Sequence, residues 1–237
     1  DDHCYKCPFE EHTHKLSCSS DPDADVETAD DYLATIPGIG YFGPEWYANI
    51  LLVAESQEGY IESTKNYLVE NENLAIPTKK GYNRYGQWYN DLIAANLPEG
   101  AEMADFRYAD WNALFAYFVY YNAGFNNNPL PITDFPINFT KAYGIPFDTS
   151  PAAWAEKLGP TYVPANEAEH EPMPGCLVFL DKDYDDEIDS VGIVIDYDYD
   201  YDDLESGVAY INIMEGDFLD PVGDYMTPDG DSCDDIL

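Results

Sequence analysis

Apolar residues recur at helical spacing in the first two thirds of the chain and form short, strand-like runs after that. The helical spacing predicts helices over residues 44–60, 110–123 and 150–159. The last of these has start and stop signals, because Ser150 and Pro151 open it and Gly159 follows it. The Gly/Tyr-rich stretch 81–91 predicts an ordered surface loop. Short apolar runs predict strands over 176–180, 191–195 and 209–214.

Helices that precede an antiparallel meander indicate an α+β fold. The alternating Asp/Tyr run at 196–203 separates two predicted strands and is expected to form a hairpin tip. With 237 residues, the chain has room for one sizeable domain and a small appendage. Composition divides it into a Cys/His-rich knuckle (1–20), a linker and lead-in (21–44), a main domain (45–220) and an acidic C-terminal tail (221–237).

Charge narrows the range of partners. The chain has 47 acidic and 10 basic residues, a formal net charge of −37. This excludes nucleic acid as a partner, since phosphates bind positively charged surfaces. Self-repulsion at such a charge destabilises the compact state, so bound divalent cations, high salt or assembly contacts are expected to offset it. A secreted protein that is simply acidic and very soluble is the alternative. No apolar run approaches the roughly 20 residues that span a bilayer.

The predicted helix over 110–123 has an asparagine, Asn112, in its first turn, with Asp110 as its expected N-cap. The segment resembles the nucleophile helix of CHAP amidases, the papain-like peptidoglycan hydrolases of bacteria. The residues that carry this resemblance are Trp111, Ala113, Phe115, Ala123 and Gly124. Asn112 stands where that family has its catalytic cysteine.

Three further segments are similar to CHAP motifs, in the same order along the chain. Residues 174–179 look like the Pro-Gly-Asp-Leu-Val-Phe strand, with Cys176 in place of Asp. Residues 189–194 look like the Asp-His-Val-Gly-Ile-Val strand, with Ser190 in place of His. Glu215 matches the acid that orients the histidine, and Asp217 replaces an Asn. Together with Trp111, the residues that resemble the family's groove are Tyr82, Arg84, Tyr85, Trp88 and Tyr89.

The resemblance implies a papain-like fold, with N-terminal helices packed on a small antiparallel sheet. It also implies a degenerate site at Asn112, Ser190, Glu215 and Asp217. Papain-like catalysis needs a thiolate nucleophile and an imidazole base. An amide does not ionise, and a hydroxyl is no base near neutral pH. We therefore expect a non-catalytic module of a secreted or cell-surface protein, acting in binding or assembly.

Two other functions remain open at this point. One is an active amidase or endopeptidase that uses other residues, such as His170. The other is a structural subunit of an extracellular polymer. The resemblance implies a Gram-positive bacterial surface as the location, and as partners a cell-wall component, another surface protein or a further copy of the chain.

The N-terminal knuckle suggests a zinc site. Cys7, His12, His14 and Cys18 have the spacing C-x4-H-x-H-x3-C, and two thiolates with two imidazoles suit tetrahedral zinc. The segment also resembles Cys-x-x-Glu-Glu-His-Thr-His units of Gram-positive surface proteins. A Cys7–Cys18 disulfide with exposed histidines is the alternative, since extracellular conditions favour that bond. The states of Cys4, Cys176 and Cys233 stay open as well.

A second metal site is suggested by acidic residues between two predicted strands. Asp181, Asp183, Asp185 and Asp189 include the D-x-D-x-D spacing of a calcium loop. Asp186 stands where an EF-hand has glycine, and Gly192 stands where it has its last glutamate. A full EF-hand is therefore excluded. A looser calcium site and an unoccupied acidic hairpin tip remain as the two alternatives.

Overall fold

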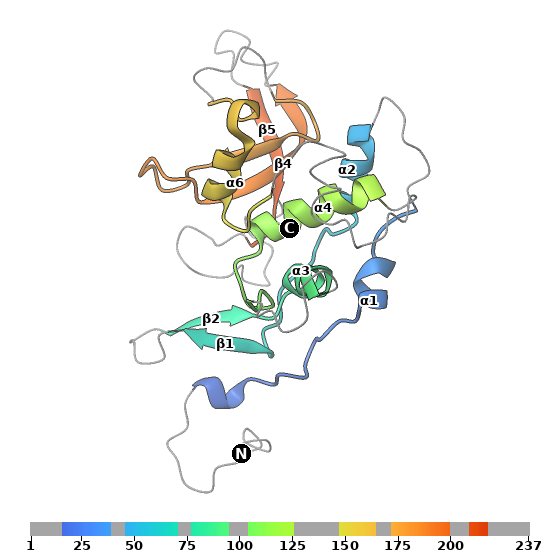
Figure 1. The fold of residues 1–237 in the computed structure, drawn as a ribbon, viewed down its shortest axis with the longest axis vertical. Coiled ribbons are helices and arrows are strands. Elements are labelled where there is room, and N and C mark those ends of the chain that lie inside the picture. The colour runs from blue at the N-terminus through green and yellow to red at the C-terminus, as the bar shows by residue number, and fades with distance from the viewer. Residues whose placement is uncertain are drawn as a thin grey trace, which may run out of the picture. The chain divides into compact units, whose positions relative to one another are not determined.

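The computed structural model describes residues 16–38, 46–70, 77–94, 104–125, 147–164, 172–199 and 209–217. The chain forms two compact units (Figure 1). Unit 1 consists of Asp1–Leu33 and Ile61–Asp110, and unit 2 of Ala34–Tyr60 and Trp111–Leu237. The segment 45–220, which composition suggests as the main domain, contributes to both units.

Unit 2 combines helices with a small antiparallel sheet, as expected for an α+β fold. Its helices are α2 (Trp46–Glu55), α4 (Asn112–Phe125) and α6 (Pro151–Leu158), and α6 continues into the 3-10 turn η3 (Gly159–Thr161). Its strands are β3 (Leu177–Leu180), β4 (Ser190–Tyr199) and β5 (Ala209–Glu215), in the order β3-β4-β5. Both pairings are antiparallel.

Helix α4 is the centre of unit 2. Its residues 113–119 have no exposed surface at all. A helix that is apolar all round is stable only when other elements cover it on every side. Helix α2 and strand β4 both pack against it (Figure 1). On another side Tyr117 stacks on Phe147, with ring centroids 3.7 Å apart, and meets the edge of Trp154 at 6.4 Å.

The predicted helices and strands of unit 2 are confirmed, except that α2 ends at Glu55, five residues before the predicted end at residue 60. Ser150 caps α6 by accepting the N–H group of Ala153 at 3.4 Å, and Gly159 ends the helix with a φ of 55°. The bounds of β3 and β5 differ from the predicted ones by one residue at an end. Strand β4 extends to Tyr199, so residues 196–199 belong to a strand rather than to the expected hairpin tip.

The described elements of unit 1 are a 3-10 turn, two helices and two strands. These are the 3-10 turn η1 (Leu16–Ser19), the helices α1 (Ala29–Ala34) and α3 (Arg84–Ala94), and the strands β1 (Tyr67–Glu70) and β2 (Thr78–Gly81). Helix α1 ends one residue beyond the boundary of the unit. Strands β1 and β2 pair antiparallel, with Tyr67 opposite Gly81. Spacing of apolar residues did not predict this hairpin, because each strand is only four residues long.

The prediction of a surface loop over 81–91 is wrong from Arg84 onward, where α3 begins. Asn83 explains the helix. Its Oδ1 accepts the N–H group of Gly86 at 2.7 Å, which is an N-cap interaction. Its Nδ2 donates to the carbonyl oxygens of Arg107 and Ala109, both at 3.1 Å. A buried cap that also binds a distant segment fixes the start of α3.

Candidate functional site

The start of α4 is held by the segment that follows β5. The N–H group of Trp111 donates to Oδ2 of Asp217 at 2.9 Å, and Asp217 has a positive φ of 53°. The expected N-cap was Asp110, but its carboxylate lies 3.0 Å from Nζ of Lys80. Asp217 therefore supplies the acceptor at this helix end. A carboxylate there is favoured because it meets the positive end of the helix dipole.

Gly216 allows this approach. A Cβ atom at this position would lie 2.6 Å from Cε3 of Trp111 and 2.7 Å from Cβ of Phe115. Only glycine leaves room for the first turns of α4. Trp111 is 4% exposed, and its ring meets the edge of Tyr60 at 5.5 Å. The end of β5 and the beginning of α4 are thus packed together without a gap.

Ser190 and Glu215 lie on neighbouring strands of the sheet. Gly192 is the β4 partner of Glu215, and Ser190 precedes Gly192 by two residues. Residues two apart on a strand share a face, so Ser190 and Glu215 are diagonal neighbours on one face of the sheet. Both residues are buried, with 2% and 4% of the residue surface exposed. Oγ of Ser190 and Oε1 of Glu215 have no hydrogen-bond partner among the described residues.

Lys182 is the cationic partner of Glu215. Its Nζ lies 2.5 Å from Oε2 of Glu215. The connection between β3 and β4 positions it, since the backbone N–H group of Lys182 donates to Oδ2 of Asp189 at 2.7 Å. Nothing in the sequence motifs pointed to this lysine. The only signal was that it is a single cation within an acidic run.

The positions of the predicted degenerate site therefore gather at one end of the sheet, where β4 begins and β5 ends. Asn112, in the first turn of α4, is half-buried. The one described cysteine of unit 2, Cys176, lies elsewhere, because its carbonyl oxygen binds Val194, four residues along β4 from Ser190. All four histidines of the chain, His170 included, lie outside the described residues. The described part of the site holds no thiol and no imidazole.

The aromatic residues expected to line a groove are mostly core residues. In unit 1, Tyr82, Tyr85 and Trp88 are only 1%, 1% and 3% exposed. Arg84 lies 2.5 Å from Glu27 in an ion pair, and Tyr89, half-buried, meets the edge of Phe106. The sixth residue, Trp111, is buried in unit 2. Side chains that fill a core have no surface left for a ligand, so burial decides against a groove-lining role for these four aromatics.

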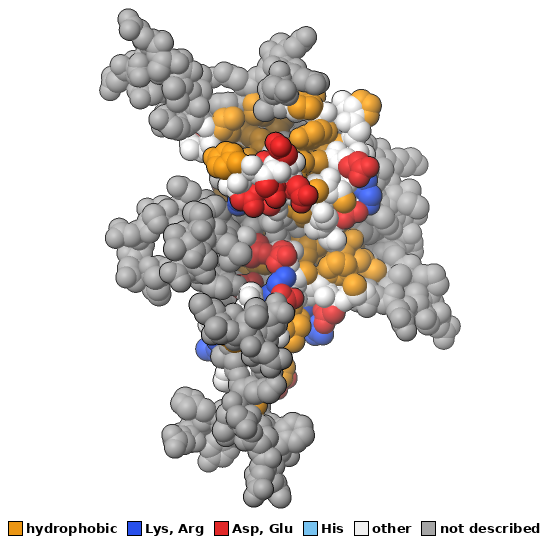
Figure 2. Space-filling view, turned by 90° about the vertical axis from the view of Figure 1, so that its left-hand side faces the viewer, with side chains coloured by type: hydrophobic (Ala, Val, Ile, Leu, Met, Phe, Trp, Pro, Cys, Tyr) orange, Lys and Arg blue, Asp and Glu red, His pale blue; other side chains and the backbone are white. Residues whose placement is uncertain are grey.

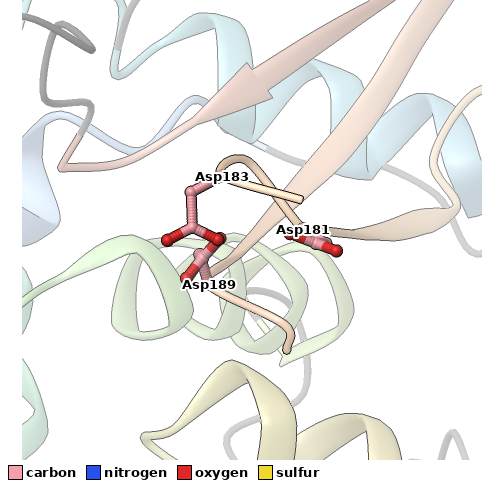
Figure 3. A group of neighbouring side chains, drawn as sticks. All are labelled: Asp181, Asp183 and Asp189. Carbon is pink, nitrogen blue, oxygen red and sulfur yellow. The ribbon is translucent and has the colours of Figure 1, made fainter. Parts of the chain in front are cut away.

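Three of the four aspartates of the predicted calcium loop are grouped. Ligand atoms of Asp181, Asp183 and Asp189 all lie within 4.8 Å of one another, and the carboxylates of Asp183 and Asp189 are side by side (Figure 3). Acidic side chains also gather on this face of the molecule in the space-filling view (Figure 2). Asp185 is outside the group, and its Oδ1 accepts the N–H group of Glu187 at 2.9 Å.

The loop is curled around Asp181. The carboxylate of Asp181 accepts the N–H groups of Tyr184 at 2.7 Å and Asp186 at 2.9 Å. Asp186 has a φ of 71°, so it makes the sharp turn for which calcium loops use glycine. The pKa of Asp183 is raised by partial desolvation and then by the negative charges of Asp185 and Asp189. A bound cation would relieve this repulsion.

Calcium is expected to stabilise unit 2 modestly. A site with a Kd of about 1 mM would add about 1.4 kcal/mol at 10 mM calcium, which is a rise of about 4 °C in Tm. Differential scanning fluorimetry measures this shift. Asp183→Asn should abolish it, and Glu187→Gln, in the same loop, should keep it. An unchanged Tm of the parent protein at 10 mM calcium would leave the loop as an unoccupied acidic tip.

The zinc ligands fall mostly outside the described residues, which is true of Cys7, His12 and His14. Cys18 lies in η1 and is half-buried. Zinc and the Cys7–Cys18 disulfide both remain predictions.

Among the helices in the described ranges, none has the length and hydropathy to cross a membrane. Comparisons of the chain with protein-family models, with curated proteins and with solved structures gave no match. The resemblance to CHAP amidases thus depends on the sequence motifs of this chain.

Proposed function

We propose that unit 2 is a non-catalytic CHAP-like domain with a papain-like arrangement, and that it acts by binding in an extracellular or cell-surface protein. One observation carries this proposal. The helix with Asn112 in its first turn begins against the segment that contains Glu215 and Asp217. Ser190 is the diagonal neighbour of Glu215 on β4. A CHAP-like site would need its nucleophile, base and orienting acid near one another, and this proximity supports the proposal.

The chemistry of these positions argues for binding rather than cleavage. At neutral pH the amide of Asn112 is not a nucleophile, and the hydroxyl of Ser190 is not a general base. Removing one member of such a pair already costs several orders of magnitude in rate. Among the described residues Glu215 has no imidazole to orient, and it is paired with Lys182 instead.

The net charge of −37 favours partners that are neutral or cationic. An anionic wall polymer would be repelled unless cations bridge the two surfaces. We therefore propose a wall peptide or sugar, or a surface protein, as the partner of this domain.

The native protein is expected to release no new amino groups from peptidoglycan. Mass spectrometry of muropeptides after prolonged incubation measures this, with an active CHAP amidase as the positive control. Loss of both nucleophile and base predicts a product level equal to that of a buffer blank. A new free amine in the products would show that the domain is an enzyme.

The placement itself can be tested by restoring the missing pair with Asn112→Cys and Ser190→His. If the two positions face each other, the introduced thiol should form a thiolate–imidazolium pair with a lowered thiol pKa. At pH 6 we expect iodoacetamide to alkylate this thiol at least about tenfold faster than in Asn112→Cys alone. Peptide mapping separates it from the native cysteines. Equal rates in two folded variants would contradict the CHAP-like arrangement.

A further inference from the structure

We propose that Lys182 takes the place of the missing imidazole as the charge partner of Glu215. This inference rests on the CHAP-like placement proposed above. In that placement the acid at 215 would face an imidazole at 190. Here Ser190 offers only a hydroxyl, and Nζ of Lys182 lies 2.5 Å from Oε2 of Glu215 instead.

Burial explains why Glu215 needs a cation. Its side chain is only 5% exposed, whereas that of Lys182 is 33% exposed. An ionised carboxylate in such a place is very unfavourable unless an opposite charge or several hydrogen bonds compensate it. Oε1 of Glu215 has no hydrogen-bond partner among the described atoms. The ion pair with Lys182 is therefore the main compensation for this buried charge.

Two hydrogen bonds fix the backbone at Lys182. Its own N–H group is held by Oδ2 of Asp189, and the N–H group of Asp189 donates to the carbonyl oxygen of Leu180 at 2.9 Å. These two bonds close the connection between β3 and β4 at its base. Lys182 thus lies just beyond the end of the β3–β4 pairing, where Leu180 is opposite Ser190. Position 190 is where the CHAP motif has its histidine.

The unpartnered hydroxyl of Ser190 fits the same explanation. A serine that had taken over the role of the imidazole would donate to Glu215. Instead Oγ of Ser190 has no partner within the described residues, although it is buried on the same face of the sheet. Ser190 fills part of the space at that position, and Lys182 provides the charge.

The first test is a double-mutant cycle on Lys182→Met and Glu215→Gln. Lys182→Met keeps most of the length of the side chain and removes its charge, which leaves Glu215 buried and unpaired. We expect Tm to fall by about 5 °C or more. Adding Glu215→Gln should recover most of this loss, because the buried charge is then gone. A fall below 1 °C for Lys182→Met, or no recovery in the double variant, would overturn the inference.

The second test asks whether an imidazole can replace the lysine. Ser190→His is introduced into the Lys182→Met protein, and Tm is measured between pH 5.5 and pH 8.5. Glu215 should raise the pKa of the introduced imidazole, so its contribution is present at low pH and is lost as the pH rises through that folded-state pKa. We expect Tm to be higher than that of Lys182→Met at pH 5.5 and equal to it at pH 8.5.

Two control variants test whether the gain in Tm comes from pairing of the imidazole with Glu215. Ser190→Asn in the Lys182→Met protein introduces a polar group that does not titrate, and it should give no pH-dependent gain. Ser190→His with Lys182 present should also give no gain, because Glu215 is already paired. If the rescue fails while the thiol at position 112 reacts rapidly beside an imidazole at 190, the CHAP-like placement stands and only the role of Lys182 is wrong. If both fail, the placement is wrong.

Discussion

Replacing Gly86 with alanine is expected to destabilise unit 1 by about 3 kcal/mol or more. A Cβ atom on Gly86 would lie 1.9 Å from the carbonyl oxygen of Phe106 and 2.6 Å from its carbonyl carbon. Both are backbone atoms, so no side chain can rotate to make room. The segment at Phe106 would have to move away from α3, and the hydrogen bonds that Asn83 makes to Arg107 and Ala109 would break.

This result would be opposite to what local helix propensity predicts. At an unconstrained helical position, replacing glycine with alanine stabilises by about 1 kcal/mol. Urea unfolding followed by circular dichroism measures the free energy. Hydrogen exchange should show the loss in peptides 84–94 and 104–110. Gly38→Ala, outside any helix and in unit 2, is the control for an unhindered glycine, because nothing lies within 4 Å of a Cβ atom there. A Gly86→Ala protein as stable as its parent would contradict the close approach.

Replacing Trp154 with alanine is expected to cost about 3–5 kcal/mol in unit 2. The side chain of Trp154 is fully buried. Its ring meets the edges of Phe147 at 5.0 Å, Phe179 at 5.9 Å and Tyr117 at 6.4 Å. This aromatic cluster joins α6 to β3 and to α4. The substitution would therefore leave a cavity where these three elements contact one another.

Trp154→Phe should be much milder. It keeps an aromatic ring, and it removes an indole N–H group that is buried with no hydrogen-bond partner among the described residues. We expect a cost of about 1 kcal/mol, because losing that unsatisfied donor offsets part of the lost packing. Comparable losses for the phenylalanine and alanine variants would indicate that the indole N–H group has a partner after all.

Elements with local signals could be predicted from the sequence. Helix α6 has its cap, its proline and its terminal glycine within ten residues, and the structure confirms each of them. Helix α4 was predicted from the helical spacing of its apolar residues. Its cap was not, because Asp217 lies on a segment that local spacing cannot relate to Trp111.

Helix α3 shows where local signals mislead. The glycines and asparagines of 81–91 are typical of a loop, yet Asn83 caps the helix and Gly86 permits a close approach of Phe106. The same stretch supplied aromatic residues that suggested a groove. Tertiary packing buries Tyr82, Tyr85 and Trp88, and composition alone does not distinguish a ring that binds a ligand from one that fills a core.

The candidate site was predictable in its membership but not in its electrostatics. The resemblance to CHAP motifs implied that Asn112, Ser190, Glu215 and Asp217 lie in one region. Lys182 was missed because it belongs to no motif and lies 33 positions from Glu215. A pairing of that kind becomes visible only when the register of β3, β4 and β5 is known.

The bond between Trp111 and Asp217 also has a consequence for synthesis of the chain. The two residues are 106 positions apart. At about 5–20 residues per second, a ribosome needs roughly 5–20 s to reach Asp217 after it has made Trp111. During this interval the apolar helix α4 has left the peptidyl-transferase centre without its terminal acceptor and without β4 and β5 to cover it. The nascent chain is thus exposed to aggregation until β5 emerges.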